Sequence, residues 1–99
     1  MERICSIHDF EEGIPLGREL KGKRVVLVKS HEGIFAFEDR CSHEENTLSD
    51  GLIEDYVVEC MYHGARFDIR TGKALSLPAV SPIHTYKTEV NGDDVLISI

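Results

Sequence analysis

The sequence predicts an all-β fold, an antiparallel sandwich or barrel, from three observations. Apolar residues rich in Val, Ile and Phe gather in runs that are too short for helices. Glycine, asparagine and aspartate separate these runs at short intervals. Helical periodicity is weak along all 99 residues. Short strands punctuated by turns in this way are typical of β sandwiches and barrels.

The N-terminal half supplies four expected strands and one short helical turn. The first strand is expected at 3–6, and the segment 8–12 can form one helical turn. A second strand is expected at 16–20, before a Lys-Gly turn. Residues 24–29 are β-branched and 34–37 are aromatic, with a glycine-containing turn between them, which favours a β-hairpin.

The C-terminal half supplies four more expected strands. Residues 57–60 and 66–69 have strand-like composition on either side of a short loop. Two further strands are expected at 85–90 and 95–99. The intervening Asn91-Gly92-Asp93-Asp94 is a strong turn signal, of the kind that connects two strands of a hairpin.

Two short groups of cysteine and histidine form the pattern C-x-H-x16-C-x2-H, with Cys41 and His43 in the first half and Cys60 and His63 in the second. Thiolate and imidazole are the side-chain ligands of zinc and iron–sulfur centres. A Cys2His2 zinc finger places its two cysteines together and its two histidines further on. Here each half contains one of each. The mixed order favours a [2Fe–2S] centre in which two histidines replace two cysteines on one iron.

The residues around the four candidate ligands carry a family resemblance. After His63 the chain runs Gly64-Ala65-Arg66-Phe67-Asp68, which resembles the C-x-x-H-G-x-x-F/Y-D stretch of Rieske-type iron–sulfur proteins. Cys41-Ser42-His43 with Leu48-Ser49-Asp50-Gly51 is similar to the first cluster loop of that family. Leu77-Pro78-Ala79 lies where the family has a proline-bearing loop over the cluster. The whole chain most resembles the small ferredoxins of bacterial aromatic-ring dioxygenase systems.

This resemblance implies one Rieske-type [2Fe–2S] cluster, with Cys41 and Cys60 on one iron and His43 and His63 on the other. It implies a single domain over residues 1–99, in which a cluster-binding subdomain at about 40–80 sits on a base built from both termini. A carrier of this kind breaks no bond in a substrate, so no catalytic residue is assigned.

The resemblance also implies a function, a one-electron carrier between a flavin-containing NAD(P)H reductase and a terminal ring-hydroxylating oxygenase. Two alternatives remain open. One is the small Rieske-like subunit of an assimilatory nitrite reductase, although several such subunits lack the ligand quartet. The other is a structural zinc-binding module, which would be colourless where an iron–sulfur protein is red-brown.

Composition limits the class of protein, its cellular compartment and its partners. The chain is 41% hydrophobic and 29% charged, as in a globular domain. No apolar run approaches the roughly 18 residues of a membrane span, and the first residues lack the pattern of a secretory signal. Of three cysteines, two belong to the motif, so a reducing cytoplasm is expected. The net charge of −7 argues against nucleic acid. It fits either charged partners or plain solubility, and a monomer is expected.

Neighbouring residues predict a low reduction potential. High-potential respiratory members resemble one another in a disulfide and in Ser and Tyr hydroxyls near the cluster. Here the matching positions are Asn46, Tyr62, Ala65 and Phe67. Fewer hydrogen bonds to cluster sulfur leave the reduced state less stabilised, which places the potential near the low end of the range of about −150 to +300 mV. Where the family usually has proline after the second cysteine, this chain has Met61, which restores a backbone N–H donor that proline lacks.

The remaining cysteine and histidines are expected to be structural. Cys5 lies in the first expected strand and should be a small buried hydrophobe. His8, His31 and His84 have no ligand-like neighbours in the sequence and are expected in turns or on the surface.

Overall fold

The computed structural model describes residues 1–41, 47–61, 64–77 and 81–99. Within these ranges the chain forms eleven strands and one short 3-10 helix, so the all-β prediction is confirmed. In chain order the elements are β1 (Glu2–Ser6), η1 (Ile7–Asp9), β2 (Leu16–Leu20), β3 (Lys23–Ser30), β4 (Gly33–Glu38), β5 (Leu52–Glu54), β6 (Val57–Glu59), β7 (Arg66–Asp68), β8 (Ala74–Ser76), β9 (Thr85–Tyr86), β10 (Thr88–Asn91) and β11 (Asp94–Ile97).

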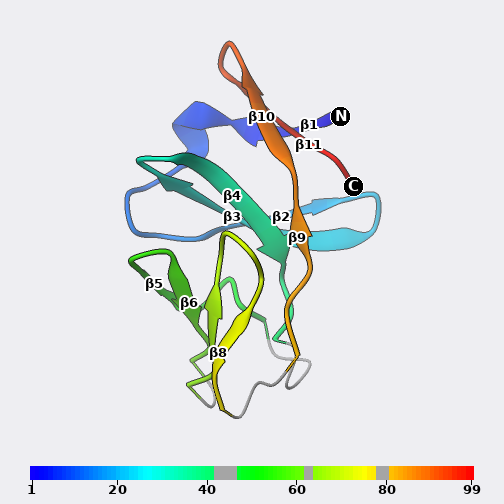
Figure 1. Ribbon diagram of the computed structural model, residues 1–99. Coiled ribbons are helices and arrows are strands. Elements are labelled where there is room, and N and C mark those ends of the chain that lie inside the picture. Colours follow the sequence, from blue (N-terminus) through cyan, green and yellow to red (C-terminus); the bar gives the residue numbers. More distant parts are fainter. Residues whose placement is uncertain (42–46, 62–63, 78–80) are drawn as a thin grey trace.

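The strands are arranged in three antiparallel sheets stacked in tiers (Figure 1). The terminal sheet has the order β1-β11-β10 and joins the two ends of the chain. The central sheet has the order β2-β3-β4-β9 and lies in the middle of the molecule. The distal sheet has the order β5-β6-β7-β8, so each strand pairs with its neighbour in sequence.

Strand β3 explains why the central sheet can support both of the others. Val25, Val26, Leu27 and Val28 are all buried, and successive side chains of a strand point to opposite faces. Val25 and Leu27 therefore pack into one core and Val26 and Val28 into the other. The terminal core contains Cys5, Val25, Leu27, Ala36, Val95 and Ile97. The distal core contains Val26, Val28, Phe37, Cys41, Leu48, Val58, Cys60, Ala65, Phe67, Ile69 and Ile83.

The strands expected at 3–6, 16–20, 24–29, 34–37, 57–60, 66–69 and 95–99 are found as β1, β2, β3, β4, β6, β7 and β11, with ends that differ by at most two residues. The hairpin of β3 and β4 and the hairpin of β10 and β11 are confirmed. The single strand expected at 85–90 is interrupted at Lys87, because β9 pairs with β4 and β10 pairs with β11. Strands β5 and β8 were not expected from the sequence. Each has three residues, and each lies at an edge of the distal sheet.

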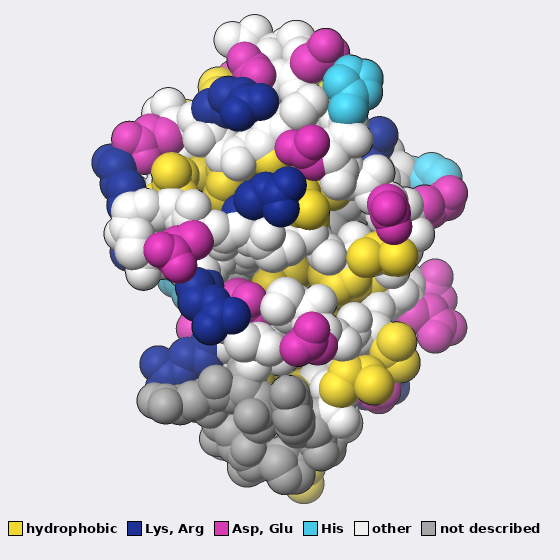
Figure 2. Space-filling view, turned by 180° about the vertical axis from the view of Figure 1, so that it is seen from behind, with side chains coloured by type: hydrophobic (Ala, Val, Ile, Leu, Met, Phe, Trp, Pro, Cys, Tyr) yellow, Lys and Arg dark blue, Asp and Glu magenta, His cyan; other side chains and the backbone are white. Residues whose placement is uncertain are grey.

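Charged side chains of both signs are interspersed over the face of the molecule seen in Figure 2, with apolar side chains between them. On this face the excess of acidic residues does not gather into one continuous patch. In the part of the chain that the structure describes, no helix is long and apolar enough to cross a membrane.

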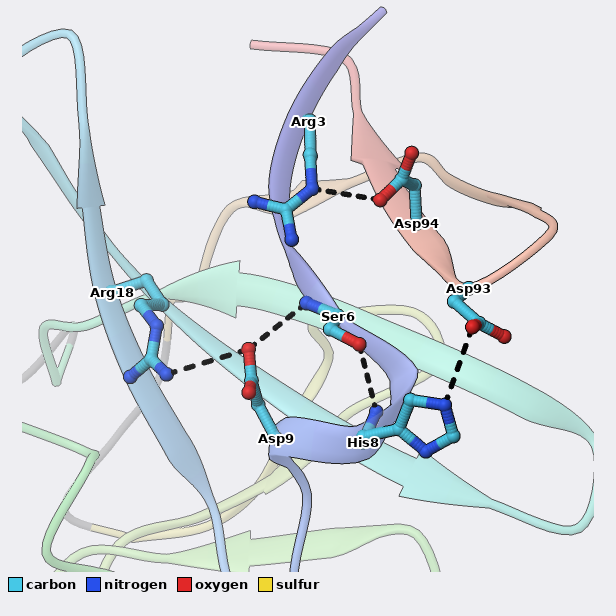
Figure 3. A network of polar contacts seen from close by, with 7 residues as sticks. All are labelled: Arg3, Ser6, His8, Asp9, Arg18, Asp93 and Asp94. Atoms are coloured by element: carbon cyan, nitrogen blue, oxygen red, sulfur yellow. Dashed lines mark hydrogen bonds and ion pairs between the residues drawn. The ribbon is translucent and has the colours of Figure 1, made fainter.

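The expected helical turn is the 3-10 helix η1, and polar contacts tie it to the terminal sheet (Figure 3). Ser6 caps the helix by accepting from the His8 amide, while the Asp9 carboxylate accepts from the Ser6 amide. Arg18 of β2 lies 3.8 Å from Asp9, which connects this helix to the central sheet. Arg3 pairs with Asp94 across β1 and β11 at 2.8 Å. Because these ion pairs are exposed, each contributes little to the free energy of folding.

Candidate metal centre

The two predicted cysteine ligands are buried in the same core. Cys41 follows β4 and is 1% exposed, and Cys60 follows β6 and is 2% exposed. Both belong to the distal core, with Leu48, Ala65 and Phe67. None of the three cysteines, all of which lie in the described ranges, forms a disulfide. The fold therefore brings two thiols from segments far apart in the sequence into one apolar environment.

The second thiol stands at the end of the hairpin between β6 and β7. The Cys60 amide donates to the Ala65 carbonyl at 2.8 Å, one position beyond the last strand pair, Glu59 with Arg66. The Gly64 amide donates to the Cys60 carbonyl at 3.0 Å. Gly64 has φ +71°, a conformation that costs a residue with a Cβ more than it costs glycine. The glycine after the second motif is thus required by the turn that carries Cys60.

The first thiol lies two residues after a buried carboxylate. The Asp39 side chain is only 4% exposed, and its Oδ1 accepts from the Leu48 amide at 2.7 Å and from the Ser49 amide at 2.8 Å. Its Oδ2 lies 3.6 Å from Arg24 Nη2. A buried carboxylate is tolerated when hydrogen bonds replace its hydration. Asp39 was not identified from the sequence, because its partners are distant amides and no local motif marks it.

The turn held by Asp39 also approaches the strand that leads to the second thiol. The Gly51 amide donates to the Leu48 carbonyl at 2.9 Å, which closes this turn. A Cβ built on Gly51 would lie 2.5 Å from the carbonyl oxygen of Glu59 and 3.2 Å from Val58 Cγ2. Only glycine allows this approach of turn and strand. The Asp-Gly pair at 50–51 signals a turn in the sequence, but its contact with β6 could not be inferred there.

Two positions at which the family resemblance raised the question of a hydroxyl group, Ala65 and Phe67, are apolar and fully buried. Ala65 and Phe67 are both 0% exposed, and both lie in the distal core with the two thiols. Neither side chain can donate a hydrogen bond to a sulfur atom.

An exposed ion pair organises the turn between β7 and β8. The Asp68 carboxylate accepts from the Arg70 amide at 2.8 Å and from Arg70 Nε at 3.2 Å. Hydrogen bonding to the Arg70 guanidinium lowers the pKa of Asp68. Arg70 also stacks over the Tyr56 ring at 4.7 Å, and Tyr56 meets Phe35 edge-on at 5.8 Å. Asp68 therefore serves as a structural partner of Arg70.

Several other predicted residues can be placed, and some lie outside the described ranges. Cys5 is 2% exposed, and burial raises the pKa of its thiol, in line with its expected role as a small hydrophobe. His8, His31 and His84 are exposed, as expected. The predicted ligands His43 and His63 lie outside the described residues, as do Asn46, Tyr62 and the proline of the closing loop. Within the described ranges no group of three or more metal-binding side chains comes together.

The described residues fit a sulfur-ligated metal group. A thiolate in an apolar core is unfavourable unless a cation compensates its charge. Two such thiols in one core, each next to a hydrogen-bonded turn, suit a metal centre that takes two cysteine ligands. A small all-β fold with two buried thiols in one core is what we expect of the class of proteins that bind a metal or iron–sulfur group through cysteine.

Comparison with known proteins identifies the family within this class. The Rieske [2Fe-2S] domain matches residues 1–87, and the chain belongs to this family. Its cofactor is accordingly one Rieske-type [2Fe–2S] cluster.

Individual relatives agree with this assignment. The ferredoxin component of biphenyl 2,3-dioxygenase from Rhodococcus jostii RHA1 is 44% identical over 100 residues, covering all of this chain and 92% of the relative. Among solved structures, the ferredoxin of carbazole 1,9a-dioxygenase from Nocardioides aromaticivorans IC177 superposes with a TM-score of 0.92 at 31% identity, covering 97% of this chain and 94% of that one.

A second similar structure comes from a complex of reduced oxygenase and oxidized ferredoxin in carbazole 1,9a-dioxygenase. Its TM-score is 0.89 at 26% identity, with 97% of this chain and 99% of that chain covered. Since relatives of this kind are named as ferredoxin components, this chain is an electron carrier rather than a catalytic enzyme.

Proposed function

We propose that this protein is the ferredoxin of a multicomponent ring-hydroxylating dioxygenase. It takes electrons singly from a flavin-containing NAD(P)H reductase and passes them to a terminal oxygenase. The observation that carries the proposal is the match along the full chain, at 44% identity, to a dioxygenase ferredoxin component. The carrier role itself is common to the matched relatives. What we propose beyond that role is the identity of its two partners. We also propose that the protein is cytoplasmic and monomeric.

The proposed cluster ligands are Cys41, His43, Cys60 and His63, in a cluster-binding subdomain at about 40–80 within a single domain of residues 1–99. The burial of both thiols in the distal core supports the cysteine half of this set. The histidine half rests on the spacing of the motif and on membership of the family. When bound, such a cluster takes up and releases one electron.

The protein supplies an environment that favours a low reduction potential. Because Ala65 and Phe67 carry no donor, no hydroxyl at either position can stabilise the added negative charge of the reduced state. Two neutral imidazoles in place of two thiolates act in the opposite direction, since they leave the oxidised centre neutral instead of doubly negative. The expected potential therefore lies within the Rieske range but near its low end, about −150 mV.

We further propose that partners dock at the end of the molecule that carries the ligand segments. Met61, directly after Cys60, is 56% exposed, and Leu77, at the end of the β7–β8 segment, is 77% exposed. Apolar side chains exposed beside a redox site are suited to a transient protein interface. An acidic chain with a net charge of −7 would also meet its partners at a salt-dependent rate.

The function is tested by redox titration and reconstitution of the purified protein. We expect a red-brown protein with a midpoint below zero, which supports turnover only when both a dioxygenase reductase and a terminal oxygenase are present. A midpoint above zero contradicts the proposed environment. A colourless, zinc-loaded protein from anaerobic, iron-replete expression contradicts the cluster itself. Turnover with an assimilatory nitrite reductase in place of the oxygenase would favour that alternative function.

The ligand assignment has a direct test in His63→Cys, with His84→Cys as a matched control on an exposed histidine. If His63 binds iron, a thiolate at this position adds negative charge to the centre and lowers the midpoint potential. The control should leave the potential unchanged. An equal potential in both variants contradicts the assignment of His63.

A further inference from the structure

The buried carboxylate of Asp39 lies two residues before the proposed ligand Cys41, and its two hydrogen-bond donors lie on the turn at 48–51. Its Oδ1 accepts two amide hydrogen bonds, at 2.7 Å from Leu48 and 2.8 Å from Ser49. The Asp39 amide in turn donates to the Arg24 carbonyl at 2.9 Å, which holds residue 39 at the end of the central sheet. Asp39 is thereby fixed to the sheet through its backbone and to the turn at 48–51 through its side chain.

These contacts join the two ends of the chain segment that contains Cys41. The segment leaves the central sheet at Asp39, and one carboxylate oxygen of Asp39 accepts from the amide of Leu48 beyond it. Leu48 is 0% exposed and packs in the distal core with both thiols. A hydrogen bond that joins residues 39 and 48 closes a loop, and loop closure in general reduces the conformational entropy of the chain between the joined residues.

The turn at 48–51 also lies against the strand that leads to Cys60, in the second half of the motif. Gly51 approaches the Glu59 carbonyl so closely that a Cβ would stand 2.5 Å from it, and Glu59 precedes Cys60. Ser49 also contacts β2, since a Cβ on Gly17 would lie 3.4 Å from the Ser49 Cβ. One carboxylate thus fixes a turn that lies against the strand leading to Cys60.

We propose that Asp39 is a positioning residue for the cluster site, which acts by holding the Leu48–Ser49 turn so that the Cys41 segment and the Cys60 hairpin keep a fixed separation. The proposal rests on the proposed ligand role of Cys41 and Cys60. What matters for this role is a hydrogen-bond acceptor at the position of Oδ1. The ion pair with Arg24 is secondary, because Arg24 is 61% exposed and 3.6 Å away.

Acceptor position and charge can be separated with two substitutions at the same site. Asp39→Asn keeps an oxygen in place of Oδ1 and removes the charge. Asp39→Glu keeps the charge but moves the oxygens outward by one methylene. Arg24→Gln is the matched control, since it removes the ion pair and leaves both amide hydrogen bonds intact.

The experiment uses the cluster-loaded proteins and measures the rate of cluster loss from the decay of visible absorption in the presence of an iron chelator. It also records the electron paramagnetic resonance spectrum of the reduced state. We expect Asp39→Glu to lose its cluster roughly tenfold faster or more, with an altered spectrum, since its carboxylate oxygens no longer lie where the two amides donate. Arg24→Gln should stay within about threefold of the wild-type rate. Asp39→Asn should keep the wild-type spectrum and lose its cluster more slowly than Asp39→Glu, since a neutral oxygen in place still accepts both hydrogen bonds, though more weakly.

Two results would overturn the proposal. One is that Asp39→Asn and Asp39→Glu both match the wild-type protein in rate and spectrum. The other is that the Asn variant loses its cluster while the Glu variant keeps it. If the Glu variant does not fold, hydrogen exchange of the Asn variant decides the question. Slow exchange of the Leu48 and Ser49 amides supports the role of Asp39, and fast exchange with an unchanged spectrum refutes it.

Failure of the ligand assignment is detected separately with Cys41→Ser. If this variant retains the complete wild-type cluster, the proposed ligand set is wrong whatever the Asp39 variants do. If it loses the cluster while the Asp39 variants all behave as wild type, only the role of Asp39 is refuted.

Discussion

Gly51→Ala is the substitution for which the structure gives the sharpest expected cost. The added Cβ would lie 2.5 Å from the Glu59 carbonyl oxygen, 3.0 Å from the Leu48 carbonyl oxygen and 3.2 Å from Val58 Cγ2. The two shortest contacts are with backbone atoms, which cannot rotate away as a side chain can. The turn and β6 must therefore separate to accommodate one methyl group.

The magnitude follows from two opposing effects. Overpacking a closely fitted site costs roughly 1–3 kcal/mol, and backbone contacts favour the upper part of that range. Replacing glycine with alanine restricts the unfolded chain and returns about 0.4–1 kcal/mol. The φ of Gly51 lies outside the positive region that favours glycine, so no conformational strain is added. A net loss of about 2 kcal/mol corresponds to a fall of roughly 8–16 °C in the apparent Tm of a domain of this size.

Circular dichroism during heating of the cluster-loaded protein measures this loss, and Gly17→Ala provides a matched control. A Cβ on Gly17 meets only the Ser49 side chain, at an ordinary 3.4 Å, and Gly17 likewise lacks a positive φ. The control should remain within about 0.5 kcal/mol of the wild-type protein. Equal melting temperatures for the two variants would refute the close approach of the turn to β6.

Three other perturbations have expected outcomes. Tyr56→Leu should lower the free energy of unfolding in urea by about 1 kcal/mol, through loss of the edge contact with Phe35, whereas Tyr56→Phe should stay near the wild-type value. The lowered pKa of Asp68 stabilises the fold above the unfolded-state value of about 3.9, and this contribution disappears as pH falls through the lower folded-state pKa. The difference in free energy of unfolding between wild type and Asp68→Asn should therefore shrink below about pH 4. A difference that stays constant with pH would contradict the lowered pKa of Asp68. Cys5 should resist iodoacetamide at pH 8 in the folded protein, judged by mass spectrometry, because burial raises its pKa; rapid labelling would contradict its burial.

The sequence was sufficient to predict features that depend on local pattern. The hairpin of β3 and β4 could be predicted because β-branched and aromatic residues on both sides of a turn favour paired strands. The ligand set Cys41, His43, Cys60 and His63 stays a prediction. The burial of Cys41 and Cys60 in one core supports its cysteine half, and His43 and His63 lie outside the described residues.

Features that depend on distant partners could not be predicted in this way. Strand β5 contains an exposed leucine, Leu52, and exists because β6 offers it a hydrogen-bonding edge. Asp39 has the sequence context of a surface residue, yet it is buried because two amides nine and ten residues away replace its hydration. In both cases the hydrogen-bond partner is a backbone group. Every residue type carries such groups, so the sequence does not indicate which of them will pair.

The pairing order of the sheets has a consequence for how the chain folds. Strands β5 to β8 pair only with sequence neighbours, so the distal sheet can form through short loop closures. The terminal sheet requires Glu2 to meet Ile97, the most distant closure in the chain. We expect amides of β6 and β7 to gain protection before those of β1 and β11 in pulsed hydrogen exchange during refolding. The hairpin that ends at Cys60 would then be ordered before the two ends of the protein meet.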